Sequence, residues 1–322
     1  MSRARARGPD VVSSIDVCQS SRTGPTTAPD RRRVSRDDGW GPMANTNSGR
    51  RITPPASGAD DTRSLAVLGV VAVFLPPLAL LVAASLRPPG SPPPATPQWL
   101  PDPASLAAYP QAVAVAGLAQ AALNSAIVCL IATPLSLLVA SWAGFALSQA
   151  PRRARRAVVA ASLLALTAPA SALLVPRFAL YRGLHLTDTL VPLIAPALIA
   201  TSPLYPLVYL LAFRAIPADL YEECRLAGLS PWRTWWRLGV PLTVPVSAGL
   251  GAFVFVTTWS NVVDPLIYLY DRERFTVPLA LRSLTTLDTT DTPVLLAGAV
   301  LATAPALLVF GVAQWLMRRR HS

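Results

Sequence analysis

The sequence predicts an all-α integral membrane protein with six transmembrane helices. The chain is 52% hydrophobic and only 14% charged, with a mean hydropathy of +0.43, which is high for a soluble domain and ordinary for a membrane protein. Long apolar runs recur along the chain, and a bilayer core needs about 20 helical residues per span. Basic residues also gather on alternate sides of these runs, as in multi-pass membrane proteins.

The first predicted span, 65–86, is uncharged. It is too long for a signal-peptide core of about 7–15 residues and begins too far from the N-terminus, so we expect it to be retained. Pro76 and Pro77 should kink it, and a Pro-rich loop follows at 87–110. The other predicted spans are 112–147, 157–175, 190–213, 242–263 and 294–317, which makes the whole transmembrane domain 64–317.

The two ends of the chain are polar. Residues 1–63 are rich in Arg, Pro, Ser and Gly, a composition typical of disorder. Met43 opens a second plausible start, so 1–42 is either part of this tail or a mis-called start. Residues 318–322 form a short basic tail.

The arginines predict the orientation. Counting along the spans, 22 of the 28 basic residues fall on the side of the N-terminal tail. Cytoplasmic loops carry the excess of basic residues. We therefore expect a multi-pass protein of the cytoplasmic membrane, with both termini and the segment 214–241 in the cytoplasm.

Composition also excludes several activities. Every basic residue is Arg, so neither a P-loop nor Schiff-base catalysis, both of which need Lys, is available. The three cysteines lie far apart and there are only two histidines, which argues against metal or redox chemistry. The net charge of +11 follows the membrane topology and does not indicate nucleic acid. We expect no enzyme activity and no cofactor in this chain.

The polar segment 214–241 carries clear helix punctuation. Pro217 suits the first turn of a helix, and the acidic residues after it lie near the positive end of the helix dipole. Gly228 is placed to end that helix in a left-handed conformation. Ser230 can cap a second helix, with Pro231 at its first position. The segment should therefore be two short helices around Gly228.

Three interpretations of this segment are open. Two helices joined at a Gly could read DNA, but both ends are tethered to the bilayer, which disfavours that interpretation. An amphipathic linker on the membrane surface would place Trp232, Trp235 and Trp236 at headgroup level. The third interpretation is a docking element for a cytoplasmic partner.

The segment resembles the coupling loop of ABC importer permeases. That loop has the pattern Glu-Ala-Ala, three residues, Gly, and then prolines where the chain re-enters the membrane. Glu222, Gly228 and Pro241 match these positions. The resemblance covers about 60–317 and includes Asn124-Ser125, and the stretches 259–269 and 276–279 resemble the carbohydrate, maltose-type subgroup.

Three positions depart from the family pattern. Glu223 and Cys224 replace the two alanines, and Ala227 replaces a common Asp. The short C-terminal tail common in the subgroup is also missing. These departures put a standard fit to the partner in doubt.

The resemblance implies a type I importer permease fold with a cytoplasmic coupling helix between spans 4 and 5. It implies sugar or oligosaccharide import driven by a separate ATPase dimer that uses the ATP, with a second permease subunit and an extracytoplasmic substrate-binding protein as partners. The coupling residues would be Glu222, Glu223, Ala227, Gly228 and Pro241. The alternatives are an ABC permease for another small solute such as a polyamine, and an ion-coupled secondary transporter, which normally needs ionisable groups inside its spans.

A few polar residues fall at or near membrane depth, where they are costly unless paired or facing water. Asn124, Asn261 and Asp264 are candidates for a translocation pathway, and helix–helix hydrogen bonding is the alternative. For Arg177 we expect the side chain to extend toward the membrane interface.

Overall fold

The computed structural model describes residues 72, 73, 75–92, 99–287 and 291–318. The chain divides between Ser57 and Gly58, and all described residues belong to the second unit. The predicted N-terminal tail 1–63, residues 319–322 of the predicted C-terminal tail 318–322, and the first part of the 65–86 span lie outside the described residues.

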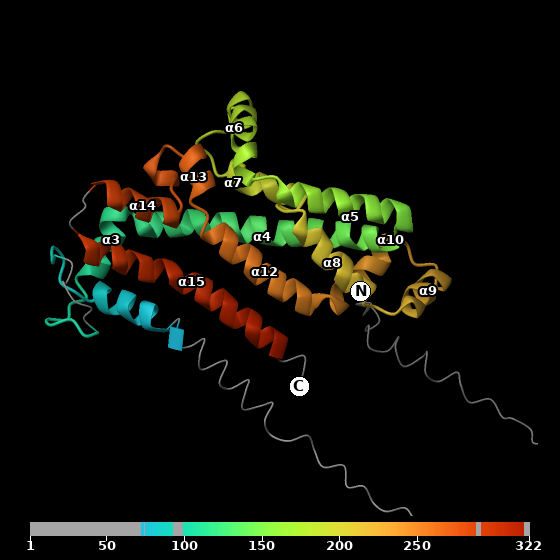
Figure 1. Ribbon diagram of the computed structural model, residues 1–322, viewed down its shortest axis with the longest axis horizontal. Helices are drawn as coiled ribbons and strands as arrows, with labels where there is room; N and C mark the ends of the chain where they lie inside the picture. Colours follow the sequence, from blue (N-terminus) through green and yellow to red (C-terminus); the bar gives the residue numbers. More distant parts are fainter. Residues whose placement is uncertain (1–71, 74, 93–98, 288–290, 319–322) are drawn as a thin grey trace, which may run out of the picture. The chain divides into compact units, whose positions relative to one another are not determined.

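Every regular element among the described residues is a helix (Figure 1). An apolar helix, Leu75–Ser85, comes first. The labelled α-helices are α3 (Ala108–Ala116), α4 (Leu118–Gln149), α5 (Arg152–Thr167), α6 (Leu174–Gly183), α7 (Val191–Ile194), α8 (Leu204–Arg214), α9 (Ala218–Leu226), α10 (Pro231–Thr234), α11 (Val240–Leu242), α12 (Val244–Trp259), α13 (Val263–Tyr268), α14 (Val277–Leu287) and α15 (Thr292–Arg318).

Four described segments are long and apolar enough to cross a membrane: Leu118–Gln149, Val191–Arg214, Val244–Tyr268 and Thr292–Trp315. They coincide with four of the predicted spans. The bent pair α5 and α6 would make a fifth if it counts as one span. The described part of the first predicted span, Leu75–Ser85, is shorter than a bilayer crossing. The number six therefore stays a prediction.

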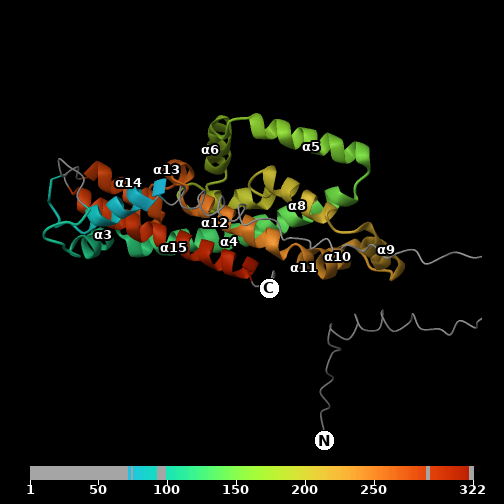
Figure 2. The same ribbon diagram turned by 60° about the horizontal axis from the view of Figure 1, so that its bottom comes forward.

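The region of the predicted span 157–175 is bent in the structure, and whether it crosses the membrane as one span stays a prediction. The helix α5 already begins at Arg152 and ends at Thr167, and α6 follows it at an angle of 87°. Pro169 explains the break, because the residue before a proline is driven out of the helical region. Ala168 accordingly has an extended ψ of 127°. Figure 2 shows α6 turned away from the line of α5.

The span predicted at 112–147 also contains a break. Gly117 takes a left-handed φ of 62° and separates α3 from α4. The helix α4 then runs without interruption to Gln149, although it contains Pro134. Hydropathy alone could not locate this break, because both helices are apolar.

The segment Val191–Arg214 is unwound in its middle. A 3-10 turn, Ala195–Ile199, follows α7, and Ala200 and Thr201 then take positive φ values of 63° and 59° before α8 begins. The hydroxyls of Thr201 and Ser136 are 2.5 Å apart, which ties the break to α4.

The helix α4 is the central helix of the described bundle, with α8 and α12 packed along it (Figure 1). One buried cluster joins α3 and the start of α4 to α12, α14 and α15. A second cluster lies toward the other end of α4 and includes Phe145, Tyr209, Phe213, Trp235 and Val254. Tyr205 and Tyr209 thus belong to the packed interior. This second cluster connects the membrane helices to the predicted coupling segment.

Candidate functional site

The helices α9 and α10 form the helix–Gly–helix segment that the sequence predicts. The helix α9 ends at Leu226, and Gly228 has a left-handed φ of 69°. The N–H of Leu229 donates to the carbonyl of Cys224, and the N–H of Gly228 to that of Arg225, both at 3.0 Å. This pair of bonds satisfies the free carbonyls at the helix end. Ser230 Oγ accepts from the N–H at the third position of α10, as a helix cap does.

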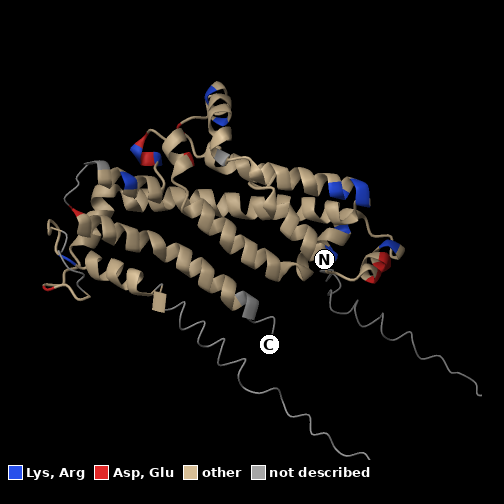
Figure 3. Ribbon diagram, in the orientation of Figure 1, with Lys and Arg blue, Asp and Glu red and all other residues tan. Residues whose placement is uncertain are grey.

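One side of this segment is open. Glu222, Glu223, Ala227 and Gly228 are all exposed, and Leu226 is 88% exposed. Neither glutamate has an ion pair with another described residue. Figure 3 shows charged residues gathered on α9 and at the opposite ends of the bundle, with few between them. This side of α9 is therefore not covered by any other described part of the chain.

The other side of the segment is attached to the membrane helices by aromatic side chains. Trp235 is only 2% exposed, and its indole N–H donates to Ser141 Oγ on α4 at 3.0 Å. Tyr221 donates its hydroxyl to the carbonyl of Phe213 on α8 at 3.0 Å. Burial raises the pKa of Tyr221 to about 12, so this phenol stays a donor at any physiological pH. The membrane-surface interpretation fails for Trp235.

The chain returns to the membrane through a widened turn. Residues Trp235–Gly239 form a π-helix, a rare element that is frequent at functional sites. A Cβ on Gly239 would lie 2.8 Å from Cε1 of Phe213, so only glycine allows this approach to α8. Thr243 Oγ1 donates to the carbonyl of Gly239 at 2.9 Å. Pro241, the predicted re-entry proline, lies in α11 directly after this turn.

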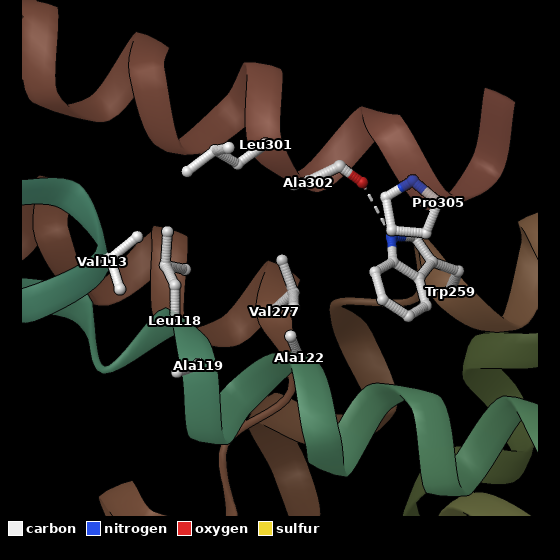
Figure 4. A pocket seen from close by; sticks show the side chains of 9 residues that line it. All are labelled: Val113, Leu118, Ala119, Ala122, Trp259, Val277, Leu301, Ala302 and Pro305. Carbon is white, nitrogen blue, oxygen red and sulfur yellow. Dashed lines mark hydrogen bonds between the residues drawn. The ribbon is translucent and has the colours of Figure 1, made fainter. Parts of the chain in front are cut away.

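Two largely apolar cavities lie at different ends of α4. One, of about 270 Å³, separates the end of α4 from the coupling segment. Its lining residues are Trp142, Phe145, Ala146, Gln149, Tyr221, Arg225, Leu229, Pro231 and Thr234. The other, of about 280 Å³, lies between α3, α4, α12, α14 and α15, beside the bond from the Trp259 indole to the carbonyl of Ala302 (Figure 4). None of the predicted site residues lines either cavity.

Asn124 lies at the other end of α4 from the coupling segment and is buried. Its side-chain amide donates to the carbonyls of Glu273 and Phe275, at 2.8 and 3.0 Å. The neighbouring Ser125 accepts from the N–H of Val277 at 2.9 Å, which caps α14 from another helix. These contacts match the hydrogen-bonding alternative for Asn124.

Asn261 and Asp264 form one polar cluster with Arg177. Asn261 donates to Asp264 at 2.8 Å, and the Arg177 guanidinium lies 3.4 Å from the same carboxylate. The guanidinium also lies 5.9 Å from the ring centre of the buried Tyr268. Arg177 therefore pairs with Asp264 on α13 instead of only extending toward the interface. A small cavity of about 20 Å³ is lined by Asn261 and by Ser125, the neighbour of Asn124.

A clamp between loops, which the sequence analysis missed, lies nearby. The Asp188 carboxylate accepts from the N–H groups of Tyr270 and Asp271, both at 3.0 Å, and lies 3.6 Å from Arg274. The N–H groups of Asp271 and Tyr270 hold the pKa of Asp188 below its ordinary value, and the charge of Arg274 adds to this. Asp188 thereby connects the loop after α6 to the loop after α13.

Comparison with known proteins shows to which family this chain belongs. Residues 108–322 match the family "Binding-protein-dependent transport system inner membrane component". The chain belongs to this family of membrane components of ABC importers.

Several relatives carry specific names. The lactose transport system permease protein LacG of Rhizobium radiobacter is 30% identical over 58% of this chain and 68% of its own length. The arabinooligosaccharides transport system permease protein AraQ of Bacillus subtilis is 28% identical over 58% of this chain and 66% of its own length. A putative ABC transporter permease protein, ORF1, of Streptomyces antibioticus is 31% identical over 65% of this chain and 92% of its own length.

The fold has a counterpart among solved structures. A chain of a bacterial ABC transporter involved in the import of the acidic polysaccharide alginate matches with a TM-score of 0.64 at 19% identity. The match covers 81% of this chain and 99% of that chain.

Proposed function

We propose that this chain is the transmembrane permease subunit of an ATP-driven importer that moves a sugar or oligosaccharide across the cytoplasmic membrane. The observation that carries the proposal is the family membership together with relatives named for lactose, arabinooligosaccharide and trehalose transport. Nothing in the described part of the chain favours a polyamine as cargo, or an ion-coupled transport mechanism, over this proposal.

In this proposal the chain crosses the membrane six times with both termini in the cytoplasm, and the coupling helix lies between spans 4 and 5. The distribution of arginines supports this orientation. The exposed side of α9 would receive an ATPase dimer, which supplies the hydrolysis that a chain without Lys cannot perform through a P-loop. A second permease subunit would complete the pathway, to which Asn261 and Asp264 would contribute polar groups. A second alginate transporter match, crystallised with a periplasmic protein carrying an alginate pentasaccharide, supports a substrate-binding protein as partner.

Glu222 is the residue that we expect to pair with a basic residue of the ATPase, while Gly228 keeps the turn that presents α9. The test is capture of the ATPase subunit by the tagged permease from detergent-solubilised membranes. Glu222→Arg should reduce capture by about 10-fold or more, as expected when one partner of a buried interface pair is reversed. Glu273→Arg, also an exposed glutamate but in the loop after α13, is the control and should capture normally. Normal capture by Glu222→Arg would refute this docking assignment.

The cargo is tested in cells by uptake of labelled lactose, trehalose and arabinotriose beside labelled spermidine. Uptake of at least one saccharide that requires this chain and survives a protonophore, but not ATP depletion, is the expected result. Uptake of spermidine alone would favour the polyamine alternative. Uptake abolished by the protonophore in cells with normal ATP would favour ion coupling.

A further inference from the structure

The coupling segment must pass its movement to the membrane helices, and its open side makes no contact with them. We propose that Trp235 is the positioning residue that joins the coupling segment to α4, so that α9, α10 and α4 move as one body. This inference rests on the proposed function, because it concerns how that function is transmitted.

Trp235 is attached to α4 in two ways. Its indole N–H donates to Ser141 Oγ at 3.0 Å, and both groups are buried. Its ring also packs edge-on against Trp142, with ring centres 5.3 Å apart. A hydrogen bond in a buried, low-dielectric site fixes the orientation of the indole ring, and the contact with Trp142 fixes its distance from α4. Together they leave the indole a single arrangement against α4.

The aromatic contacts extend from Trp235 in both directions. Trp232 lies 4.7 Å from Trp235 and 5.1 Å from Trp142, measured between ring centres, so α10 is held at both of its ends. On the other side, Phe145 of α4 packs against Phe213 of α8 at 5.5 Å and reaches Tyr221 of α9 at 6.4 Å. Every ring in this cluster therefore contacts at least one ring from another helix.

Within the described residues, side chains of 218–239 donate two hydrogen bonds to the membrane helices. They are the bond from Trp235 to α4 and the bond from Tyr221 to α8. The first is the better placed to transmit a push, because α4 spans the bilayer length and packs along both α8 and α12. Packed helices transmit displacement as rigid bodies, so movement of α10 should reach the far end of α4.

The attachment of the coupling segment to α4 is tested by pulsed electron paramagnetic resonance, which measures distances between spin labels at Leu226 on α9 and Leu130 on α4. Both side chains are exposed, and all three cysteines of the chain, Cys18, Cys129 and Cys224, are first replaced by serine. The wild-type background should give a narrow distance distribution, with and without ATP and vanadate. Trp235→Ala should lose that narrow distribution. Trp236→Ala, which removes a neighbouring tryptophan that is 58% exposed, should keep it. An unchanged distribution in Trp235→Ala would overturn the proposal.

Two milder variants isolate the hydrogen bond. Trp235→Phe and Ser141→Ala each remove one partner, and both keep most of the packing. In the transporter reconstituted with its ATPase, each should lower the amount of saccharide moved per ATP by about 2- to 10-fold, the range for one lost buried hydrogen bond. The double variant should lose no more than the larger single loss. Fully additive losses, or an unchanged ratio in both single variants, would overturn the role of this bond.

The outcomes separate this inference from the proposed function. If the wild-type chain captures no ATPase, the proposed function fails, while the distance distribution without nucleotide still tests the attachment to α4. If capture and basal hydrolysis are normal in Trp235→Phe and Ser141→Ala, loss of the transport ratio cannot come from misfolding. If Trp235→Ala does not fold, these two conservative variants decide the question.

Discussion

The helices α4 and α8 approach each other closely at Gly144. A Cβ at this position would lie 2.5 Å from Cβ of Tyr209, 2.8 Å from the carbonyl oxygen of Pro206 and 2.9 Å from the backbone nitrogen of Leu210. Two of these three atoms are backbone and cannot rotate away. Gly144→Ala therefore forces the helices apart.

The magnitude follows from contact distances. Carbon atoms in contact lie about 3.5–4.0 Å apart, so α8 would have to move by about 1 Å. Overpacking a close-packed interior costs about 1–3 kcal/mol, and a clash with backbone belongs at the upper end. In a membrane the close approach of small residues is itself a main source of helix association. We expect a loss of about 3 kcal/mol, which corresponds to a melting temperature lower by about 6–12 °C.

Two other glycines provide matched controls. A Cβ on Gly298 would also lie 2.5 Å from its neighbour, but that neighbour is Cδ2 of Leu281, the end of a flexible side chain. A Cβ on Gly311 meets nothing within 4 Å. In thermal unfolding in detergent, Gly144→Ala should lower the melting temperature most and Gly298→Ala only slightly. Gly311→Ala should leave it unchanged or raise it slightly. A Gly144→Ala protein that melts with Gly311→Ala would refute the reasoning.

Two further predictions concern the loops that face away from the coupling segment. Because the pKa of Asp188 is depressed in the folded chain, its clamp should be fully formed above the ordinary value of 3.8 and lost as the pH falls through the lower folded value. Hydrogen exchange at the Tyr270 amide should show protection down to that ordinary value and a loss below it, and Asp188→Asn should remove the pH dependence; protection that already declines near neutral pH would contradict this. Asn124→Ala removes the donor of two partly buried hydrogen bonds, to the carbonyls of Glu273 and Phe275, at about 0.5–1.5 kcal/mol for each bond. The melting temperature should therefore fall, and an unchanged value would show that these bonds contribute nothing.

Local signals in the sequence predicted the two short helices around Gly228 well. Pro217, Gly228 and Ser230 act within one or two helical turns, and each takes the expected place at a helix end. Apolar length likewise predicted four described spans. Both kinds of signal depend on neighbours in sequence, which is why they could be interpreted without a structure.

Long-range partners could not be predicted in this way. Trp235 and Trp236 are adjacent and chemically identical, yet Trp235 is buried and Trp236 is exposed. The partner of Trp235, Ser141, lies on another helix and 94 residues away in the sequence, so no local pattern could distinguish the two tryptophans. The pairing of Arg177 with Asp264 has the same origin. The break in 157–175 was different, since Pro169 was visible in the sequence and an apolar window simply averaged over it.

The unwound stretch at Ala200 and Thr201 constrains how this chain is turned in the bilayer. Acyl chains offer no hydrogen bonds, so backbone that has left the helical pattern is tolerated at this depth only against protein or water. Ala200 is already covered inside the chain, whereas Thr201 is exposed in the isolated subunit. If this segment crosses the membrane as proposed, we expect the side of the bundle that bears Thr201 to face protein or water instead of acyl chains. In the proposed importer, this helix break would then mark the side of the subunit that faces its partner subunits.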